Sequence, residues 1–193
     1  MITVSTSKTV ERTYHHGDLR AALIEAGLKL LEDRQGDDIG LREAARAVGV
    51  SATAVYRHFP DKAALLRALS AEGFARLAEA QRGAQEAAGG GQAGFVATGR
   101  AYVRFALDNP ALFRLMFSNA PEQDLTVAAT QEKAPEAFRM LRENAAHLLP
   151  PGATAEAVTV AALGAWAKVH GLSVLILDGQ VPRDDRLIDA LIG

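Results

Sequence analysis

Hydrophobic positions along this chain recur at helical spacing, and no run alternates polar and apolar residues at the period of two expected of a strand. Near the start, Leu19, Leu23, Ala26 and Leu30 fall on one face of a helix that Asp18 would cap. Comparable patterns are expected at about 41–48, at 53–59, from 62 into the Gly-rich stretch, at 93–107, from 110, at 121–148, at 154–177 and after Pro182. We therefore predict an all-α protein of about nine helices.

Glycine and proline mark the breaks between these helices. Gly49 is placed for the left-handed turn that ends a helix, and Pro60 closes the next one. The stretch 89–94 predicts a flexible loop between two helical regions. It is a poor phosphate loop, because Phe95 and Val96 stand where Lys and Ser or Thr are required.

Composition narrows the class of protein. The 193 residues are 49% hydrophobic and 23% charged, with a net charge of -2, as expected of a soluble globular protein. The lack of cysteine excludes disulfides and thiolate metal sites, and the first twenty residues have no signal-like apolar run, so we predict a cytoplasmic location. The apolar stretch 157–177 is about as long as a membrane span, but Lys168 and His170 favour a helix buried in protein, without a membrane partner.

One segment combines two helices, a tight turn and positive charge. In LREAARAVGVSATAVYRHFPDKAALL, residues 41–66, Ala45 permits a close helix crossing, Gly49 turns the chain and Val55 anchors the second helix. Four basic and two acidic residues between Arg42 and Lys62 give it a local charge of +2. This pattern predicts a helix-turn-helix, whose second helix enters the major groove of DNA. From these residues alone, a helical hairpin within a bundle explains the pattern equally well.

The segment resembles the DNA-binding domain of the TetR/AcrR family of transcription regulators. The likeness rests on GVSATAVYRHFPDKAALL and continues upstream in YHHGDLRAALIEAGLKLLE, residues 14–32. Near the other end, WAKVHG at 166–171 resembles the Trp-x3-His-Gly signature of one class of C-terminal domains in this family. Gly40 departs from the usual Ser or Thr cap, which leaves the first turn of the helix at 41–48 in question.

The resemblance implies a division of the chain into three parts. These are a flexible basic arm at 1–14, a helix-turn-helix DNA-binding domain at 15–62, and a helical ligand-binding and dimerisation domain at 63–193. Lys8 and Arg12 would lie over the DNA backbone, and a disordered tail without that role is the alternative.

Each residue of the motif has an expected role at operator DNA. Hydroxyl and methyl groups at the start of the second short helix suit base edges, and by resemblance Tyr56 and His58 reach phosphates. Lys62 adds its charge to the dipole at the next helix N-terminus, and Phe59 is expected in the core. The expected DNA contacts are Arg42, Ser51, Ala52, Thr53, Tyr56, His58 and Lys62.

The C-terminal part implies two further surfaces. The candidate pocket for an unidentified small-molecule effector is lined by Tyr102, Phe105, Phe113, Met116, Phe117, Trp166 and His170, each of which is otherwise explained as a core residue. By resemblance, the last two helices pair with their copies in a homodimer, which matches a palindromic operator. The candidate residues of that seam are Leu175, Ile176, Leu187 and Leu191.

These observations predict a ligand-responsive transcription regulator, most simply a repressor, that uses no cofactor or metal and is not an enzyme. One alternative is an enzyme built on a helical bundle, for which the sequence lacks Cys, a Glu-x-x-His pair and Gly-x-Ser-x-Gly. The other is a helical small-molecule carrier, which would give no reason for the YRHF cluster.

Overall fold

The computed structural model describes residues 19–34, 39–118 and 136–193. Within these ranges the chain forms helices and turns without a strand, which confirms the prediction of an all-α fold. The helices are α1 (Leu19–Asp33), α2 (Leu41–Val48), α3 (Ala52–Tyr56), α4 (Lys62–Ala87), α5 (Gly91–Asp108), α6 (Pro110–Ser118), α7 (Glu136–Leu148), α8 (Ala155–Leu177) and α9 (Asp185–Ile192). The arm at 1–14, the Asp18 cap and the first part, 121–135, of the helix expected at 121–148 lie outside the described residues.

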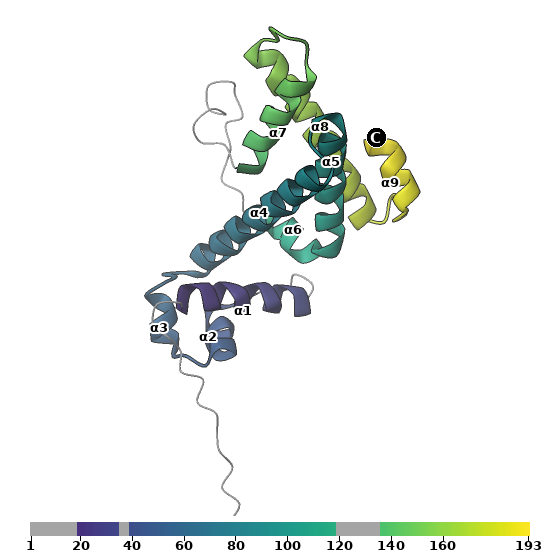
Figure 1. Cartoon of the computed structure of the whole chain (residues 1–193). Coiled ribbons are helices and arrows are strands. Elements are labelled where there is room, and N and C mark those ends of the chain that lie inside the picture. The colour runs from purple at the N-terminus through teal and green to yellow at the C-terminus, as the bar shows by residue number, and fades with distance from the viewer. Residues whose placement is uncertain (1–18, 35–38, 119–135) are drawn as a thin grey trace, which may run out of the picture.

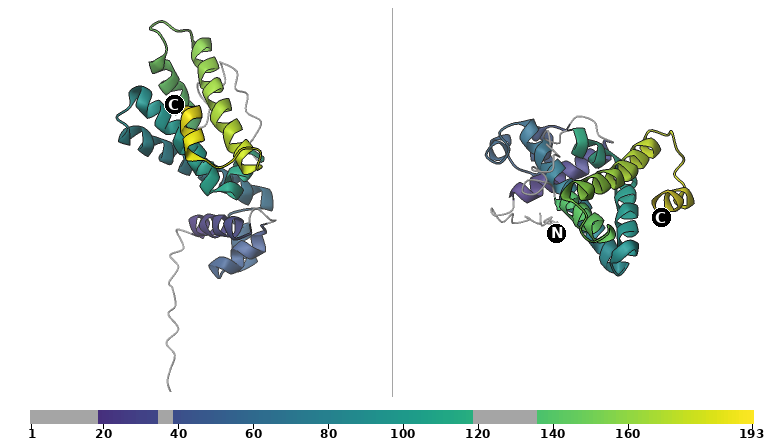
Figure 2. Two further views of the ribbon diagram at one scale, coloured as in Figure 1. Left: turned by 90° about the vertical axis from the view of Figure 1, so that its right-hand side faces the viewer. Right: turned by 90° about the horizontal axis from the view of Figure 1, so that it is seen from above.

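The described helices form two groups joined by one long helix. The first group is α1, α2 and α3, and α4 runs from it into the second group, α5 to α9 (Figure 1). α4 packs along α5, α8 packs against α5 and α7, and α9 lies on α5 at the outside of the bundle (Figure 2). The expected domain boundary after residue 62 thus falls at the start of a helix that both groups share, and that boundary stays a prediction.

Short polar side chains cap several helices by accepting hydrogen bonds from the backbone N–H groups of the first turn. Asp61 Oδ1 accepts from Ala64 N–H at 2.6 Å before α4, and Thr154 Oγ1 accepts from Ala157 N–H at 3.1 Å before α8. At α2, where Gly40 has no side chain, the Glu43 carboxylate accepts from the Gly40 N–H at 3.1 Å. The first turn of α2 therefore forms despite the missing Ser or Thr.

The loop expected at 89–94 is shorter in the structure, where it is a tight turn that ends as α5 begins at Gly91. Gly89, Gly90 and Gly91 have φ values of 77°, 75° and 59°, so the chain reverses within these three residues and α5 begins at Gly91. Gly94 lies within α5, where a Cβ would be 3.2 Å from Gln85 Cγ of α4. This glycine therefore lets α5 return close alongside α4.

The buried face of α1 overlaps the expected one, since Leu23 is buried and Leu19 and Leu30 pack against the core, but it extends further to one side. The residues of α1 that are buried are Leu23, Ile24, Gly27, Leu28 and Leu31, whereas Ala26 and Leu30 are partly exposed. The reason is Gly27, where a Cβ would lie 2.9 Å from Leu69 Cδ2 of α4. The close approach of α4 at this glycine sets the rotation of α1 about its axis.

The length and apolar composition of α8 would suit a membrane span, and it is the one such helix among the described residues. One helix of this kind is weak support for a membrane protein, because core helices share these properties. Val169, Leu172 and Ser173 are buried against the rest of the protein. The other face is open, with Val160 64% and Leu175 45% exposed, so the expectation of a helix covered on nearly all sides is wrong for a single chain.

The contact between α4 and α6 depends on Gly73. A Cβ there would lie 2.7 Å from Met116 Sδ and 3.0 Å from Leu112 Cδ1. We expect Gly73→Ala to lower the free energy of unfolding by about 1–3 kcal/mol through overpacking. Gly83→Ala on the same helix meets open space and should raise it by about 0.5–1 kcal/mol. Urea unfolding followed by circular dichroism measures both, and an unchanged Gly73→Ala protein would contradict the close packing of α6 on α4.

Candidate DNA-binding surface and effector site

The turn between α2 and α3 has the geometry expected of a helix-turn-helix. Gly49 ends α2 with φ of 78°, and the Val50 N–H donates to the Ala45 carbonyl at 3.0 Å. Ser51 caps α3 by accepting from the Ala54 N–H at 3.3 Å. α3 is shorter than predicted, ending at Tyr56, and a further turn continues to Phe59, whose N–H donates to the Val55 carbonyl at 2.9 Å.

A small apolar core fixes α3 against its neighbours. Val55 is fully buried, and Ala45 and Phe59 are 3% and 2% exposed. The Arg20 guanidinium lies 5.4 Å from the centre of the Phe59 ring, a cation–π contact from α1. Because the buried positions of α3 are anchored in this way, its remaining side chains are held in one orientation.

The expected DNA contacts lie on the accessible side of this unit. The exposed ones are Arg42, Ser51, Thr53, Tyr56 and His58, while Ala52 and Lys62 are half-buried. They come from the first turn of α2, from α3 and the residues that follow it, and from the first residue of α4. Tyr56 is 49% exposed. No contact among the described residues accounts for the exposure of this large ring.

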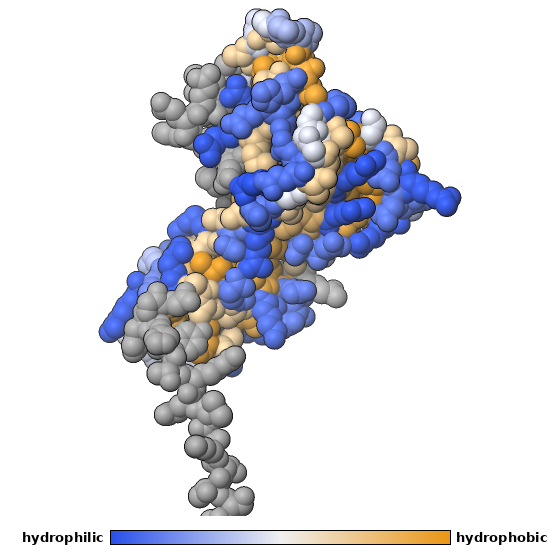
Figure 3. Space-filling view, in the orientation of Figure 1, coloured by the Kyte–Doolittle hydropathy of each residue, from blue (hydrophilic) through white to orange (hydrophobic). Residues whose placement is uncertain are grey.

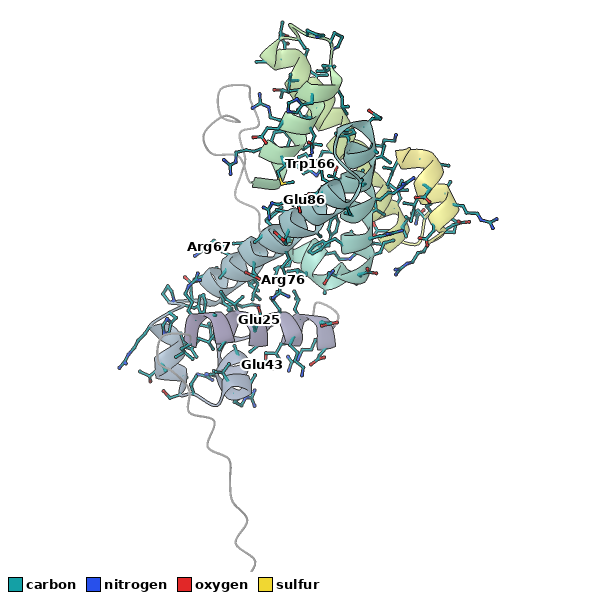
Figure 4. The ribbon with its side chains drawn as sticks, in the orientation of Figure 1. Glu25, Glu43, Arg67, Arg76, Glu86 and Trp166 are labelled. Carbon is teal, nitrogen blue, oxygen red and sulfur yellow. The ribbon has the colours of Figure 1, made fainter. Side chains whose placement is uncertain are left out.

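Ion pairs connect the N-terminal helices to one another and to α4. Arg34 donates to Glu43 at 2.6 Å, and the Gly40 N–H together with this guanidinium holds the pKa of Glu43 below its usual value. Arg76 of α4 donates to Glu72 at 2.9 Å and to Glu25 of α1, and Figure 4 shows Arg76 and Glu25 near the contact between these helices. The pairs are exposed and contribute little stability, but they orient α1 on α4.

An aromatic cluster lies where α5, α6 and α8 meet. The His170 ring centre is 4.5 Å from that of Phe117 and 5.4 Å from that of Phe113. Trp166 lies 5.8 Å from His170 and 6.2 Å from Phe117, and Figure 4 shows it inside the second group of helices. Tyr102 joins the cluster edge-on to Phe113 at 5.7 Å.

Three members of this cluster are also hydrogen-bonded. Trp166 Nε1–H donates to Tyr102 Oη at 3.1 Å, and Tyr102 Oη lies 2.9 Å from His170 Nδ1. Burial raises the pKa of the Tyr102 hydroxyl well above its usual range, and the Trp166 hydrogen bond opposes this shift. Burial lowers the pKa of His170, which favours the uncharged imidazole.

The structure separates two of the proposed pocket residues from the other five. Phe105 lines an open depression of about 550 Å³ between α4, α5 and α9, together with Arg100, Arg104 and four alanines. Met116 is fully buried against Gly73 and packs α6 on α4. Because Phe105 belongs to a different surface and Met116 to the helix packing, we no longer propose either as an effector contact.

Two aromatic residues of the cluster are absent from the sequence-based set. Phe138 of α7 lies 6.0 Å from Trp166, and Phe74 of α4 lies 5.5 Å from Phe117. An isolated aromatic within a helical pattern is ordinarily a core residue, so the sequence holds no signal that singles them out. Phe74 is of interest because it connects the cluster to α4, the helix that follows α3.

The residues of the proposed dimer seam differ in accessibility. Leu175 and Leu191 are 45% and 42% exposed, and Leu187 is half-buried. Ile176 is 8% exposed and belongs to the core of its own chain, so we withdraw it from the seam. It lies one residue from Leu175, about 100° around the helix, and therefore faces inward.

Comparison with known proteins places the two groups of helices in one family. A family model described as bacterial regulatory proteins of the tetR family matches residues 23–69. A second, described as the C-terminal domain of tetracyclin repressor-like proteins, matches residues 95–192. The chain therefore belongs to the TetR family of bacterial regulators, and it is a transcription regulator, not an enzyme. The Trp-x3-His-Gly class of its C-terminal domain stays a prediction.

Solved structures share this fold. A protein of unknown function from Rhodococcus sp. RHA1 is 33% identical, with a TM-score of 0.74, over 94% of this chain and 93% of its own. A TetR transcriptional regulator from the same organism is 21% identical, with a TM-score of 0.57, over 92% and 96% of the two chains. One from Marinobacter aquaeolei VT8 is 19% identical, with a TM-score of 0.55, over 91% and 92%. The last two likenesses concern the fold alone, and none of the curated proteins compared matches the chain significantly.

Proposed function

We propose that this regulator is a cytoplasmic repressor that binds a palindromic operator as a homodimer and leaves it when a small molecule binds the aromatic cluster. The observation that carries the proposal is the anchored α3, whose accessible side chains include Ser51, Thr53 and Tyr56. Short hydroxyl side chains suit base edges, and an exposed tyrosine suits a phosphate. The proposed base-reading residues are therefore Ser51, Ala52 and Thr53, and the proposed phosphate contacts are Arg42, Tyr56, His58 and Lys62.

The open face of α8 supports the homodimer. Val160, Gly164, Gly171 and Leu175 follow one another at intervals of four, seven and four residues, which are about one, two and one helical turns, so they form a single stripe. A Cβ at Gly164 or Gly171 would meet nothing within 4 Å, so a helix of a second copy has room to approach. Figure 3 shows apolar surface near the top of the molecule, where α7 and α8 lie, and further apolar areas lower on the same face.

The contacts of Phe117 support an effector that acts on DNA binding. Phe117 touches His170 and Trp166 of α8 on one side and Phe74 of α4 on the other. The Ser70 hydroxyl of α4 also donates to the Met116 carbonyl at 3.3 Å. A molecule that displaces Phe117 would therefore shift α6 against α4, and by linkage its binding free energy would change the affinity for DNA.

The test begins with an operator selected from random duplex DNA and a gel-shift titration over a range of salt concentrations. We expect Lys62→Ala to bind this operator more weakly and to reduce the slope of log affinity against log salt by about 0.9 per subunit, the value for one lost phosphate contact. Thermal unfolding of the variant is measured alongside, so that weaker binding is separated from a loss of stability.

Arg139→Ala is the matched control, since it removes one exposed positive charge from α7, outside the DNA-binding unit. Its affinity and slope should equal those of the unmodified protein. Unchanged values for Lys62→Ala would remove that residue from the DNA contacts. A protein that selects no duplex at all would favour the small-molecule carrier.

A further inference from the structure

The hydrogen bonds among Trp166, Tyr102 and His170 have a direction. The indole has an N–H and no acceptor, so Trp166 donates to Tyr102 Oη. Between Tyr102 Oη and His170 Nδ1, 2.9 Å apart, either atom is able to supply the proton. The choice decides whether the neutral His170 carries its proton on Nδ1 or on Nε2.

The burial of Tyr102, which is 4% exposed, decides between these arrangements. If His170 Nδ1 donated, the Tyr102 oxygen would accept twice and its own hydrogen would have no acceptor among the described residues. A buried donor without a partner is costly, whereas donation by Tyr102 to Nδ1 satisfies all three groups. The proton of His170 then resides on Nε2, which no described residue contacts by a hydrogen bond.

We propose that Tyr102 fixes His170 as a hydrogen-bond donor through Nε2. The effector is then a largely apolar molecule that carries no positive charge and bears one acceptor, either a carbonyl or a carboxylate. This inference rests on the effector site of the proposed function. The rings of Phe113, Phe117 and Trp166, centred 4.5 to 5.8 Å from that of His170, supply the apolar surroundings in which a single hydrogen bond discriminates well. Tyr102 acts through His170 and is a positioning residue.

The first experiment needs no ligand. Nitrogen NMR of the imidazole in the whole protein should show His170 with Nε2 protonated and Nδ1 unprotonated. Tyr102→Phe keeps the ring and removes the hydroxyl, so we expect a mixture of both tautomers. Trp166→Phe removes the N–H donated to Tyr102 and leaves a smaller aromatic ring in its place, and it should keep the single Nε2–H tautomer. A proton on Nδ1 in the unmodified protein, or an unchanged tautomer in Tyr102→Phe, would overturn the inference.

The second experiment compares two probes that differ in the acceptor alone, acetophenone and ethylbenzene. Trp166 is the only tryptophan of the chain, so its indole N–H signal reports binding at this site. We expect acetophenone to bind the unmodified protein about fivefold to tenfold more tightly than ethylbenzene, as one hydrogen bond provides. In His170→Phe, which retains an aromatic ring, the two dissociation constants should agree within about twofold.

The outcomes separate the inference from the proposed function. Equal binding of both probes to the unmodified protein would overturn the inference and leave the effector site in place. If neither probe moved the Trp166 signal, the effector site would itself be misplaced, and the inference would fail with it. Preference for acetophenone that persists in His170→Phe would assign the donor to another residue.

Discussion

Leu175→Glu is expected to turn the proposed homodimer into monomers that no longer bind a palindromic operator. Leu175 is 45% exposed on the open face of α8, and twofold symmetry would bury both copies of the new carboxylate in the seam. An unpaired charge in such a place costs several kcal/mol, and a cost of about 4 kcal/mol weakens association roughly a thousandfold. Light scattering at micromolar protein measures the state of assembly, and the gel shift measures DNA binding.

Leu148→Glu is the control, because it makes the same change at a leucine that is 37% exposed at the end of α7. It should leave both assembly and DNA binding intact, whereas Leu191→Glu should behave as Leu175→Glu. Dimers in both seam variants would move the interface away from α8 and α9.

Phe59→Ala is expected to unfold the DNA-binding unit well below the melting temperature of the unmodified protein. Phe59 is 2% exposed, and truncation of a buried phenylalanine costs about 3–5 kcal/mol. The loss also removes the cation–π contact with Arg20 of α1. Calorimetry should show an early transition for α1 to α3, with dimerisation through the second group of helices retained.

Tyr56→Ala removes another aromatic ring three residues earlier in the same turn, where the side chain is 49% exposed. We expect its stability to change by less than about 0.5 kcal/mol, while its affinity for all duplex sequences falls. The pair thus separates folding from binding within one short segment. An unchanged melting profile for Phe59→Ala would contradict the core described around α3.

Several helix limits could be predicted from the sequence, because the signals that start and stop a helix are local. Thr154 and Asp61 cap the helices they precede, and Gly49 ends α2 at the expected residue. The roles of Gly27 and Gly94 could not be predicted in this way. Each is set by a neighbour on another helix, Leu69 and Gln85 respectively, and a helical pattern carries no information about that neighbour.

For the candidate sites, too, the residue types could be predicted from the sequence, but their packing could not. Of the residues expected to line an effector pocket, those at 102, 113, 117, 166 and 170 lie together in one aromatic cluster, and the pocket itself stays a proposal. Phe105 is three residues from Tyr102, so the two side chains lie about 60° apart around α5 and meet different helices. The rotation of each helix about its axis is set by packing between helices. The surfaces on which Phe105 and Ile176 lie depend on that rotation, so the sequence pattern could not place them.

The glycines of this chain differ in how much mutation they tolerate. At Gly27 and Gly73, a Cβ would lie under 3.0 Å from a side chain of a neighbouring helix, and at Gly94 it would lie 3.2 Å from Gln85 Cγ, so a substitution there requires a neighbour in the same chain to shift in every state of assembly. At Gly164 and Gly171, a single chain would accept any residue that favours a helix. In a dimer sealed along α8, only small residues would be accepted there. The range of residues tolerated at these two positions therefore indicates whether a second copy packs against α8.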